Sequence, residues 1–481
     1  MSKQKHLDIG ITVAKSKDVS EWYTQVITKG ELIDYTLVSG CYILRPNAYA
    51  IWEKLQFFID GEIKKRGVKN VSFPLFIPES LLKKEASHIQ GFKAEVAWVT
   101  QGGDHDLVER LAIRPTSETI ICDAFSRWVR SYRDLPIKIN QWCNVVRWEF
   151  KHPTPFLRTR EFLWQEGHTV HANDLDAKAE VLDMLGVYKH VFEEVLAIPM
   201  ISGRKSDAEK FAGAEYTLSV ETFLPSGKAI QGATSHYLGH HFAKVFDIGF
   251  LDENGVRQLV HHNSWGFSTR AIGVMVLMHS DDKGLVLPPK VAPLPVVIVP
   301  IIFDKTKVEV LAYASRIQAA INVESHIDTR EEHTAGYKFN YWELVGVPLR
   351  VECGPKDVEK NQVVVVRRDT GHKEVVSIDS VSSVVDKVLD DIQKSLFEKA
   401  KKMLDASIID VSSFDELKKV VNGKRVARVS WCGNSVCEKR VIDACEASKS
   451  LCIPLEQPKK LHSCAVCGEK GVSMILFARS Y

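Results

Sequence analysis

Two strand-like segments within residues 137–170 constrain the fold of this sequence more than any other feature. They flank KHPTP at 151–155, a run of residues typical of turns. Every second side chain of a strand shares a face. One face of the second segment therefore carries Arg158, Arg160, Phe162, Trp164, Glu166 and His168, and in the first segment Arg147 and Glu149 share a face.

Alternating arginine, aromatic, acidic and histidine side chains suit neither a hydrophobic core nor an ordinary solvent-exposed face. Guanidinium groups bind phosphate and carboxylate oxygens, and an aromatic ring offers a surface on which a nucleobase stacks. We therefore interpret this face as a binding site, and a hairpin that is merely charged and exposed is the alternative.

Three other clusters carry chemically useful side chains. RPTSE (114–118) offers a hydroxyl and a carboxylate, which suit an ammonium group. QGATSH (231–236) packs small residues with Gln231, Thr234 and His236, and SWGFSTR (264–270) places Arg270 at the start of an apolar helix. Taken singly, each cluster is better explained as an ordinary loop or helix start.

The order of segments along the chain predicts three domains. The first contains a helix at 46–66, a strand with two prolines at 71–78, an amphipathic helix at 174–197 and a strand that leads into an apolar helix at 261–279. Four prolines between residues 288 and 295 then break regular structure. Beyond them apolar strands alternate with helices, which is typical of an α/β domain, and a charged helix near 386–403 leads to a cysteine-bearing segment. We expect domains at 1–287, 296–400 and 401–481, with a linker at 288–295.

Composition narrows the class of protein. A chain of 481 residues has room for about three domains. The formal net charge of +2 excludes a highly basic nucleic-acid coat and a disordered acidic chain, although residues 138–160 and 424–440 each hold five Lys or Arg against one Glu. The start MSKQKHLDIG lacks the apolar core of a secretory signal, and no apolar run reaches the roughly 18–20 residues of a membrane helix. We therefore expect a cytoplasmic protein that does not enter a membrane.

Taken together, the segments resemble the three signature motifs of class II aminoacyl-tRNA synthetases, and most closely the prolyl-tRNA synthetases of the archaeal and eukaryotic-like type. GCYILRPNAYAIWEKL through FPLFIP resembles motif 1, NVVRWEFKH with PFLRTREFLWQEGHT resembles motif 2, and SWGFSTRAIGVMVLMHSDDKGLVLPP resembles motif 3. RPTSE, KFAGAEYT and QGATSHYLG resemble the proline-pocket and adenylate segments, and LRVECGPKD resembles part of the anticodon-binding domain. The resemblance implies an α+β catalytic domain with an antiparallel sheet, an α/β anticodon-binding domain and a small C-terminal α/β zinc domain.

The resemblance also implies a role for each candidate residue. Arg147 and Arg270 would be the catalytic residues, and ATP would be bound by Arg147, Glu149, Arg158, Phe162, Gln231, Thr234 and Arg270. Phe162 and Arg270 would hold the adenine between them. Proline would be bound by Thr116, Glu118, Arg147, Trp164, Glu166, His168, Phe211 and His236.

The implied reaction is the ATP-dependent attachment of L-proline to tRNA(Pro) through prolyl-adenylate, with Mg²⁺ bound to the ATP. The resemblance further implies a homodimer formed through motif 1, with Pro74 as the interface proline. Glu352 and Lys356 are candidates for reading the anticodon. Only 92 residues separate His168 from His261, so we expect no bacterial-type editing domain.

Six of the ten cysteines fall between residues 432 and 467, and this crowding predicts a metal site. Cys432 and Cys437, together with Cys464 and Cys467, form two closely spaced pairs of the kind that tetrahedral zinc requires. Gly433 and Gly468 suit the tight turns beside them. Other candidate ligands are Cys445, Cys452 and His462. A closed four-cysteine site would be structural, because it leaves no position for water. A different ligand set and a metal-free domain remain alternatives.

Two other functions fit parts of the pattern. The first is another class II synthetase, specific for threonine or histidine. A catalytic zinc for threonine would need cysteine and histidine ligands in the first domain, and residues 1–288 offer no paired cysteines. The second is an inactive synthetase-like protein that binds RNA. That alternative predicts broken ATP motifs, yet Arg147, Arg158 and Arg270 are all present.

Overall fold

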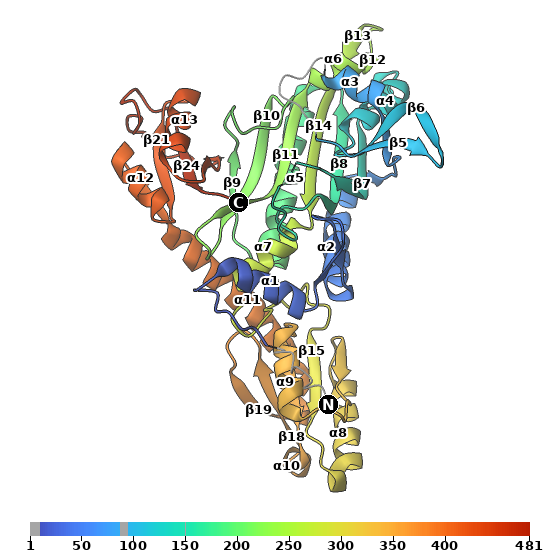
Figure 1. Ribbon diagram of the computed structural model, residues 1–481, viewed down its shortest axis with the longest axis vertical. Helices are drawn as coiled ribbons and strands as arrows, with labels where there is room; N and C mark the ends of the chain where they lie inside the picture. Colours follow the sequence, from blue (N-terminus) through green and yellow to red (C-terminus); the bar gives the residue numbers. More distant parts are fainter. Residues whose placement is uncertain (1–9, 87–94, 150) are drawn as a thin grey trace.

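The computed structural model describes residues 10–86, 95–149 and 151–481, and it has three parts (Figure 1). A large sheet with its helices forms the first part, a second sheet lies at the opposite end of the long axis, and the C-terminal residues pack beside the first part. The start of the chain, on which the predicted lack of a secretory signal rests, lies outside the described residues. None of the helices described is both long and apolar enough to cross a membrane.

An eight-stranded sheet forms the centre of the first part. Its order is β23-β9-β10-β11-β14-β8-β7-β3. The strands are β3 (Lys69–Asn70), β7 (Ile137–Val146), β8 (Glu161–His171), β9 (Ile201–Arg204), β10 (Tyr216–Phe223), β11 (Ala229–Gly239), β14 (His261–Ser268) and β23 (Ile453–Pro454). Every neighbouring pair is antiparallel except β3 and β7. The expected antiparallel sheet is thus confirmed.

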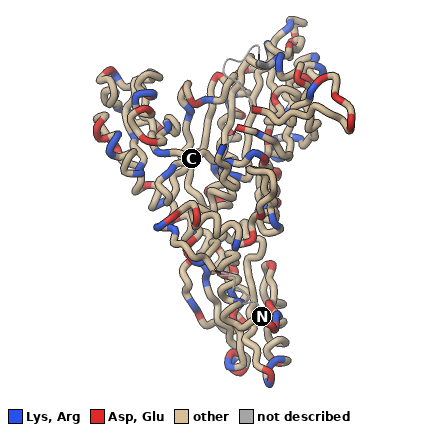
Figure 2. The backbone as a smooth tube through the Cα atoms, in the orientation of Figure 1, with Lys and Arg blue, Asp and Glu red and all other residues tan. Residues whose placement is uncertain are grey.

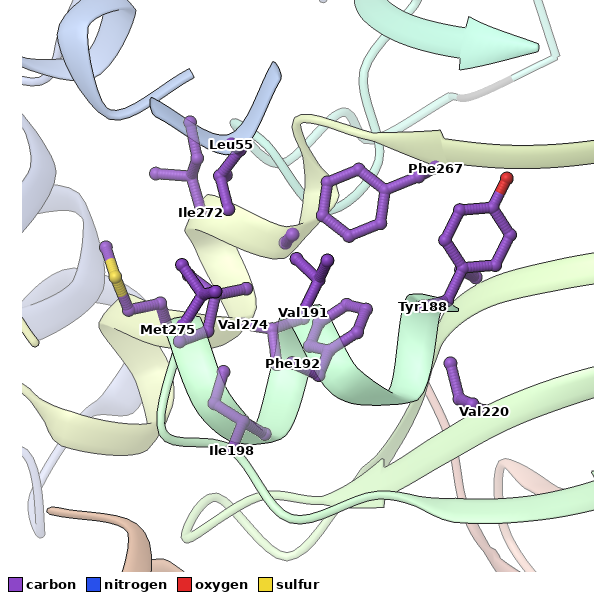
Figure 3. Close-up of a cluster of buried hydrophobic side chains, with 14 of the residues drawn as sticks. Leu55, Tyr188, Val191, Phe192, Ile198, Val220, Phe267, Ile272, Val274 and Met275 are labelled. Atoms are coloured by element: carbon purple, nitrogen blue, oxygen red, sulfur yellow. The ribbon is translucent and has the colours of Figure 1, made fainter. Parts of the chain in front are cut away.

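Helices pack on one face of this sheet and bury the main core. They are α1 (Val19–Lys29), α2 (Pro46–Lys65), α5 (Asp174–His190) and α7 (Arg270–His279), and a π-helical turn follows α5 at Val191–Val195. Tyr188 and Phe192 pack against Phe267 of β14, with ring centroids 6.0 and 5.4 Å apart (Figure 3). Because the helices occupy this face, the opposite face of the same strands is left for a binding site.

Smaller elements complete the first part of the chain. They are β1 (Ile33–Tyr35), β2 (Tyr42–Leu44), β4 (Phe76–Pro78), α3 (Glu79–Ala86), β5 (Trp98–Gly102), β6 (His105–Ile113), α4 (Glu118–Trp128), α6 (His241–Phe246), β12 (Gly249–Leu251) and β13 (Arg257–Leu259). The strand expected at 71–78 is therefore shorter than predicted. The prolines explain this difference, because proline has no N–H to donate to a sheet.

The predicted hairpin is present, but its second strand starts later than expected. Strand β8 begins at Glu161, so Arg158 and Arg160 precede it. Arg158 N–H donates to Thr154 O at 2.9 Å, and Arg160 N–H donates to Gly40 O at 2.9 Å. The prediction that Arg158 and Arg160 share a strand face with Phe162 was wrong. Arg158 lies in a turn with Thr154, and although the Arg160 carbonyl accepts a hydrogen bond from Arg147 N–H at 2.7 Å, its N–H is directed to Gly40.

The middle part is an α/β domain, as the sequence predicted. Its sheet has the order β16-β15-β17-β18-β19. The elements are β15 (Val296–Pro300), α8 (Lys307–Ala320), β16 (Ser325–Ile327), α9 (Ala335–Leu344), β17 (Leu349–Cys353), α10 (Pro355–Glu359), β18 (Gln362–Arg367) and β19 (Lys373–Ser377). The proline-rich linker packs against the protein, since Val291 and Ala292 are fully buried.

The C-terminal part joins the rest of the molecule through a long helix and a shared strand. Helix α11 (Val381–Ser407) crosses the boundary expected at residue 400. The elements that follow are β20 (Ile408–Val411), α12 (Phe414–Asn422), β21 (Val426–Trp431), α13 (Ser435–Ala444), β22 (Ser448–Ser450) and β24 (Ser473–Arg479). Strand β23 leaves this part and pairs with β9 at the edge of the eight-stranded sheet.

Lys and Arg are interspersed with Asp and Glu along the whole molecule (Figure 2). The two basic stretches are partly neutralised by this arrangement. Lys138 pairs with Glu180 at 3.0 Å, and Arg428 pairs with Asp410 at 2.5 Å. The charge available to bind a phosphate backbone is therefore smaller than the sequence count suggests.

Buried His279 should make the fold sensitive to acid. It ends α7, its Nε2–H donates to Leu196 O at 2.9 Å, and burial lowers its pKa to about 4. In the unfolded state the imidazole of His279 takes up a proton near pH 6.5. The contribution of neutral His279 to the free energy of unfolding is therefore fully present above pH 6.5 and is lost as the pH falls toward 4. The loss is about 1.4 kcal/mol per pH unit.

We expect His279→Gln to lose about 2 kcal/mol less unfolding free energy than the wild type between pH 7 and pH 5. Urea unfolding at the two pH values measures this difference. His105→Gln, at an exposed histidine of β6, is the matched control and should behave like the wild type. An acid loss in His279→Gln equal to that of the wild type would contradict the prediction.

Candidate active site

A cavity of about 280 Å³ opens on the face of the eight-stranded sheet that the helices leave free. Strand register places its floor in one row, because Gln141 lies opposite Glu166, Glu166 opposite Gly266, and Gly266 opposite Thr234. The sequence-predicted residues that line it are Thr116, Glu118, Arg147, Phe162, Trp164, Glu166, His168, Phe211, Gln231, Thr234, His236 and Arg270. Residues from six segments of the chain thus meet in one place.

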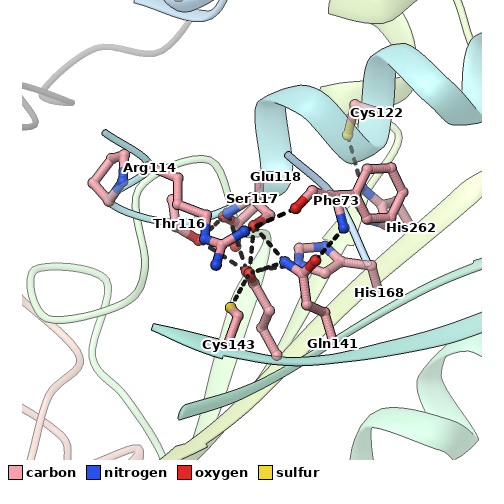
Figure 4. A network of polar contacts seen from close by, with 12 residues as sticks. Phe73, Arg114, Thr116, Ser117, Glu118, Cys122, Gln141, Cys143, His168 and His262 are labelled. Carbon is pink, nitrogen blue, oxygen red and sulfur yellow. Dashed lines mark hydrogen bonds and ion pairs between the residues drawn. The ribbon is translucent and has the colours of Figure 1, made fainter. Parts of the chain in front are cut away.

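One end of the cavity is a buried acidic network (Figure 4). Glu166 accepts hydrogen bonds from Ser117 N–H at 3.0 Å and Gln141 Nε2–H at 3.2 Å, and also from the Ser117 hydroxyl. The Thr116 hydroxyl donates to Glu118. Glu118 begins α4, directly beside these groups.

Glu166 and His168 form a buried ion pair with a separation of 3.2 Å. Burial alone would raise the pKa of Glu166, but the contacts from His168 and Ser117 hold that pKa below its usual value. Burial opposes protonation of His168, but Glu166 and Glu118 raise its pKa. With two carboxyl groups and one imidazole, this end of the cavity suits a small cationic group.

The side wall of the cavity is organised around His236. The Thr217 hydroxyl contacts His236 Nδ1 at 2.8 Å, and the Thr234 hydroxyl contacts Nε2 at 3.0 Å. Phe211 packs on the imidazole, with ring centroids 4.8 Å apart. Burial, reinforced by the positive charges of His168 and Arg147, lowers the pKa of His236 to about 3. His236 is therefore neutral at physiological pH, and it acts as a hydrogen-bonded wall.

Two arginines, Arg147 and Arg270, also line the cavity. Arg147 Nε–H donates to Pro115 O at 3.0 Å, and its guanidinium lies 5.4 Å from the Phe162 ring and 5.2 Å from the Trp164 ring. Burial and the charges of Arg147 and Arg158 lower the pKa of Arg270 to about 10. Crowded cations of this kind favour an anionic ligand.

Glu149 and Arg158 do not line the main cavity. They line an adjoining hollow, which also contacts Arg147, Phe162 and Arg270. Strand β7 ends at Val146, so Glu149 belongs to the loop after it and not to a strand face, which corrects that expectation. The loop carries Glu149 and Arg158 to the hollow beside Arg147 and Arg270.

Several lining residues were not singled out from the sequence: Glu209, Thr217, Ser264, Trp265 and Ser268. Ser264 and Ser268 lie in SWGFSTR on the same strand face, so alternation along that strand could have located them. Trp265 has the opposite parity, and Thr217 of KFAGAEYT lies only at the start of β10, so alternation indicates neither of them. Glu209 is a single acid in a loop, and no local pattern indicates it. Gly167 is also required here, because a Cβ at this position would come within 2.2 Å of the Trp265 ring.

The two candidate anticodon readers differ in exposure. Glu352 in β17 is buried and bonded to Arg350 at 3.0 Å, with Lys373 at 3.4 Å. Lys356 is exposed on α10. Both residues lie where β17 ends and α10 begins.

The four cysteines of the predicted metal site come together in the C-terminal part. Their sulfur atoms all lie within 4.8 Å of one another, and Cys432 Sγ is 3.7 Å from the Sγ atoms of both Cys437 and Cys467. A tetrahedron with zinc–sulfur bonds of about 2.3 Å has edges of nearly that length, so the donor set fits zinc. Gly433 and Gly468 have φ angles of +83° and +81°, which explains glycine at these turns.

The rival ligands lie elsewhere. Cys445 is buried in the hydrophobic core of the C-terminal part, and Cys452 packs against Gly203 of β9. The His462 carbonyl accepts a hydrogen bond from Ser430 at 2.6 Å. Among the described residues, neither Cys445, Cys452 nor His462 belongs to the four-sulfur group.

Comparison with known proteins identifies the family. Three family models match: the class II tRNA synthetase core domain for Gly, His, Pro, Ser and Thr over residues 96–279, an anticodon-binding domain over 295–388, and the C-terminal domain of prolyl-tRNA synthetase over 414–481. A proline–tRNA ligase of Alkaliphilus oremlandii is 47% identical over the full length of both chains. The chain belongs to the prolyl-tRNA synthetases.

Two further relatives agree with membership of the prolyl-tRNA synthetases. A putative proline–tRNA ligase of Saccharomyces cerevisiae is 46% identical over 98% of this chain and 73% of its own length. A crystal structure of prolyl-tRNA synthetase from Cryptosporidium parvum, complexed with halofuginone and AMPPNP, has a TM-score of 0.95 and 46% identity, and the match covers 98% of this chain and 100% of that one. The chain is thus a class II proline–tRNA ligase, and the threonyl, histidyl and inactive alternatives are not supported.

Proposed function

We propose that the cavity activates L-proline with ATP to form prolyl-adenylate, and that the prolyl group then passes to tRNA(Pro). The observation that carries this proposal is the pairing of opposite electrostatics in one cavity. Buried carboxyl groups of Glu118 and Glu166 and the guanidinium groups of Arg147 and Arg270 line the same cavity. Proline has a cationic imino group and an anionic carboxylate, so its imino group would face the carboxyl groups and its carboxylate would face the arginines.

In the first step, a proline carboxylate oxygen attacks the α-phosphorus of ATP and pyrophosphate leaves. Arg147 would bind the α-phosphate and the proline carboxylate, and Arg158 would reach the γ-phosphate. Phe162 and Arg270 would enclose the adenine, Glu149 would accept from its amino group, and Gln231 and Thr234 would position the ribose or the adenylate. No protein nucleophile is required, so catalysis rests on positioning and charge stabilisation.

Mg²⁺ would enter as part of the ATP complex, where it neutralises phosphate charge. In the second step, a hydroxyl of the 3′-terminal ribose of tRNA attacks the activated carbonyl and AMP leaves. The middle domain would bind the anticodon, with Lys356 exposed for contact and Glu352 held in place by Arg350.

The proposed proline contacts predict a specific kinetic defect. Glu118→Gln should raise the KM for proline by about 10- to 100-fold and leave the KM for ATP nearly unchanged, because hydrogen bonds to a charged group contribute about 1.5–3 kcal/mol. Glutamine can still accept the Thr116 hydroxyl, so this substitution isolates the charge. Asp123→Asn, on the outer side of the same helix and paired with Arg127, is the control. An unchanged KM for proline would exclude Glu118 from the imino site.

The function is tested by ATP–pyrophosphate exchange with a panel of amino acids, followed by charging of tRNA(Pro). We expect exchange with proline and none with threonine or histidine. Binding of tRNA without any exchange would favour an inactive RNA-binding protein. Residues between His168 and His261 form α5, β9 to β13 and α6, all within the first part of the chain. Lack of editing stays a prediction, which hydrolysis of alanyl-tRNA(Pro) by this chain would overturn.

We also propose a homodimer through the motif 1 region, in the cytoplasm. Pro74 is exposed, and Arg114 Nη1–H fixes the neighbouring Phe73 carbonyl at 2.9 Å. Large apolar side chains of the same region are exposed in one chain: Leu37, Ile43, Phe57 and Phe76. Analytical ultracentrifugation at micromolar protein concentration should give a molecular mass twice the 54.2 kDa of one chain. A 54.2 kDa species under these conditions would contradict the dimer.

For the C-terminal part we propose one structural zinc ion bound by Cys432, Cys437, Cys464 and Cys467. The zinc would fix the turns at Gly433 and Gly468. It takes no part in the chemistry of the cavity, because four thiolate ligands leave no open coordination position.

A further inference from the structure

The loop between β9 and β10, at residues 205–215, lies between the substrate cavity and the C-terminal part. On the cavity side, Glu209 and Phe211 line the wall, and Phe211 packs on His236. Phe211 N–H also donates to the Thr217 hydroxyl at 3.0 Å, and that hydroxyl contacts His236. The position of this loop therefore determines the shape of the wall beside the proposed proline site.

On its other side the loop is held by Glu438 of α13. Glu438 is 1% exposed, and its Oε1 accepts the hydroxyl of Ser206 at 2.6 Å and the hydroxyl of Ser450. Within the described parts of the chain, no ion pair to Glu438 is found and its Oε2 has no hydrogen-bond partner. Burying a carboxylate without a neighbouring cation costs folding free energy. A contribution to stability therefore does not explain why a glutamate occupies position 438.

Neighbouring contacts fasten the same loop to the same domain. Lys205 Nζ–H donates to Leu451 O at 2.7 Å, and Lys449 pairs with Glu209 at 3.3 Å. Strand β23 pairs with β9 immediately before the loop. The loop is thus anchored at both Ser206 and Glu209 by residues that lie more than 220 positions later in the sequence.

We propose that Glu438 is a positioning residue, through which the C-terminal domain holds one wall of the proline site. This inference rests on the proposed function of the cavity. Glu438 directly follows Cys437, so the proposed metal site and the loop contact begin on the same turn of α13. The C-terminal domain then acts on substrate binding as well as on stability.

The test compares three variants in proline-dependent ATP–pyrophosphate exchange. Glu438→Ala should raise the KM for proline by about tenfold, with the KM for ATP changed less than about twofold, since one charged hydrogen bond to the loop is lost. Glu438→Gln should restore most of the proline affinity, because its amide oxygen still accepts the Ser206 hydroxyl. Glu446→Ala, in the same domain and paired with Arg479 at 3.0 Å, should match the wild type.

Two readouts separate this role from a general structural defect. Metal content and the thermal unfolding temperature of Glu438→Ala should stay close to those of the wild type. If that variant does not fold, Ser206→Ala removes the partner from the loop side and should raise the KM for proline in the same way. An unchanged proline KM in a folded Glu438→Ala, or in Ser206→Ala, would overturn the proposal. Wild-type protein without any proline-dependent exchange would instead contradict the proposed function.

Discussion

Arg147→Ala is expected to abolish proline-dependent ATP–pyrophosphate exchange while the fold stays intact. Arg147 lines both the main cavity and the adjoining hollow, as do Phe162, Ser268 and Arg270. It would contact the attacking carboxylate and the α-phosphate, where charge develops in the transition state. Loss of one donor at such a position lowers a rate by about 100- to 1,000-fold, and a cation shared by two anionic groups should exceed this.

The measurement is the exchange rate at saturating ATP and proline, together with circular dichroism to monitor folding. Arg257→Ala provides a control with the same change in charge, because Arg257 pairs with Asp247 at 2.7 Å on the exposed hairpin of β12 and β13. Near-normal exchange by a folded Arg147→Ala would exclude the assigned role. A parallel loss of exchange and secondary structure would mean that Arg147 is needed for folding, which also contradicts the prediction.

The second large effect is expected at the cysteine site. Cys437→Ser should purify without zinc, whereas the wild type should contain about one zinc ion per chain. Structural zinc contributes about 10–16 kcal/mol of apparent binding energy in small zinc domains, so its loss should unfold the C-terminal part at a lower temperature than the rest. Elemental analysis and calorimetric unfolding measure the two effects.

Cys445→Ser is the matched control for the cysteine site. Cys445 is equally buried in the same domain but lies outside the four-sulfur group, so this variant should keep its zinc. Native protein that contains no zinc would reject the site. Zinc retained by Cys437→Ser and lost from Cys445→Ser would assign a different ligand set.

Local patterns predicted much of the cavity correctly. Alternation along β8 placed Phe162, Trp164, Glu166 and His168 on one face, because the period of a strand is fixed by backbone geometry. The same rule failed at Arg158 and Arg160, whose N–H groups bond to Thr154 and Gly40 before strand β8 begins at Glu161. A local pattern gives the period of a strand, but it does not say where the hydrogen-bonded ladder begins.

The predicted metal ligands show a similar limit. Spacing alone left Cys445, Cys452 and His462 as alternatives to the two close pairs. Folding separates them, because Cys445 follows the C-terminal end of α13, outside the four-sulfur group, and β23 carries the chain beyond Cys452 to the edge of the large sheet. The tertiary packing of the residues between the two cysteine pairs selects the ligands, and the spacing of cysteines in the sequence does not describe that packing.

The sequence by itself determined the chemistry of this protein: a class II synthetase with an acidic pocket, arginines for phosphate and two cysteine pairs. Each of these features is assembled from short local motifs, such as RPTSE, SWGFSTR and the two closely spaced cysteine pairs. Only the tertiary structure decided which distant groups support them. Gln141 and Ser117 meet Glu166, and Glu438 meets Ser206, through sheet register and domain packing. Contacts between residues so far apart depend on how whole strands and helices align, and local sequence does not encode that alignment.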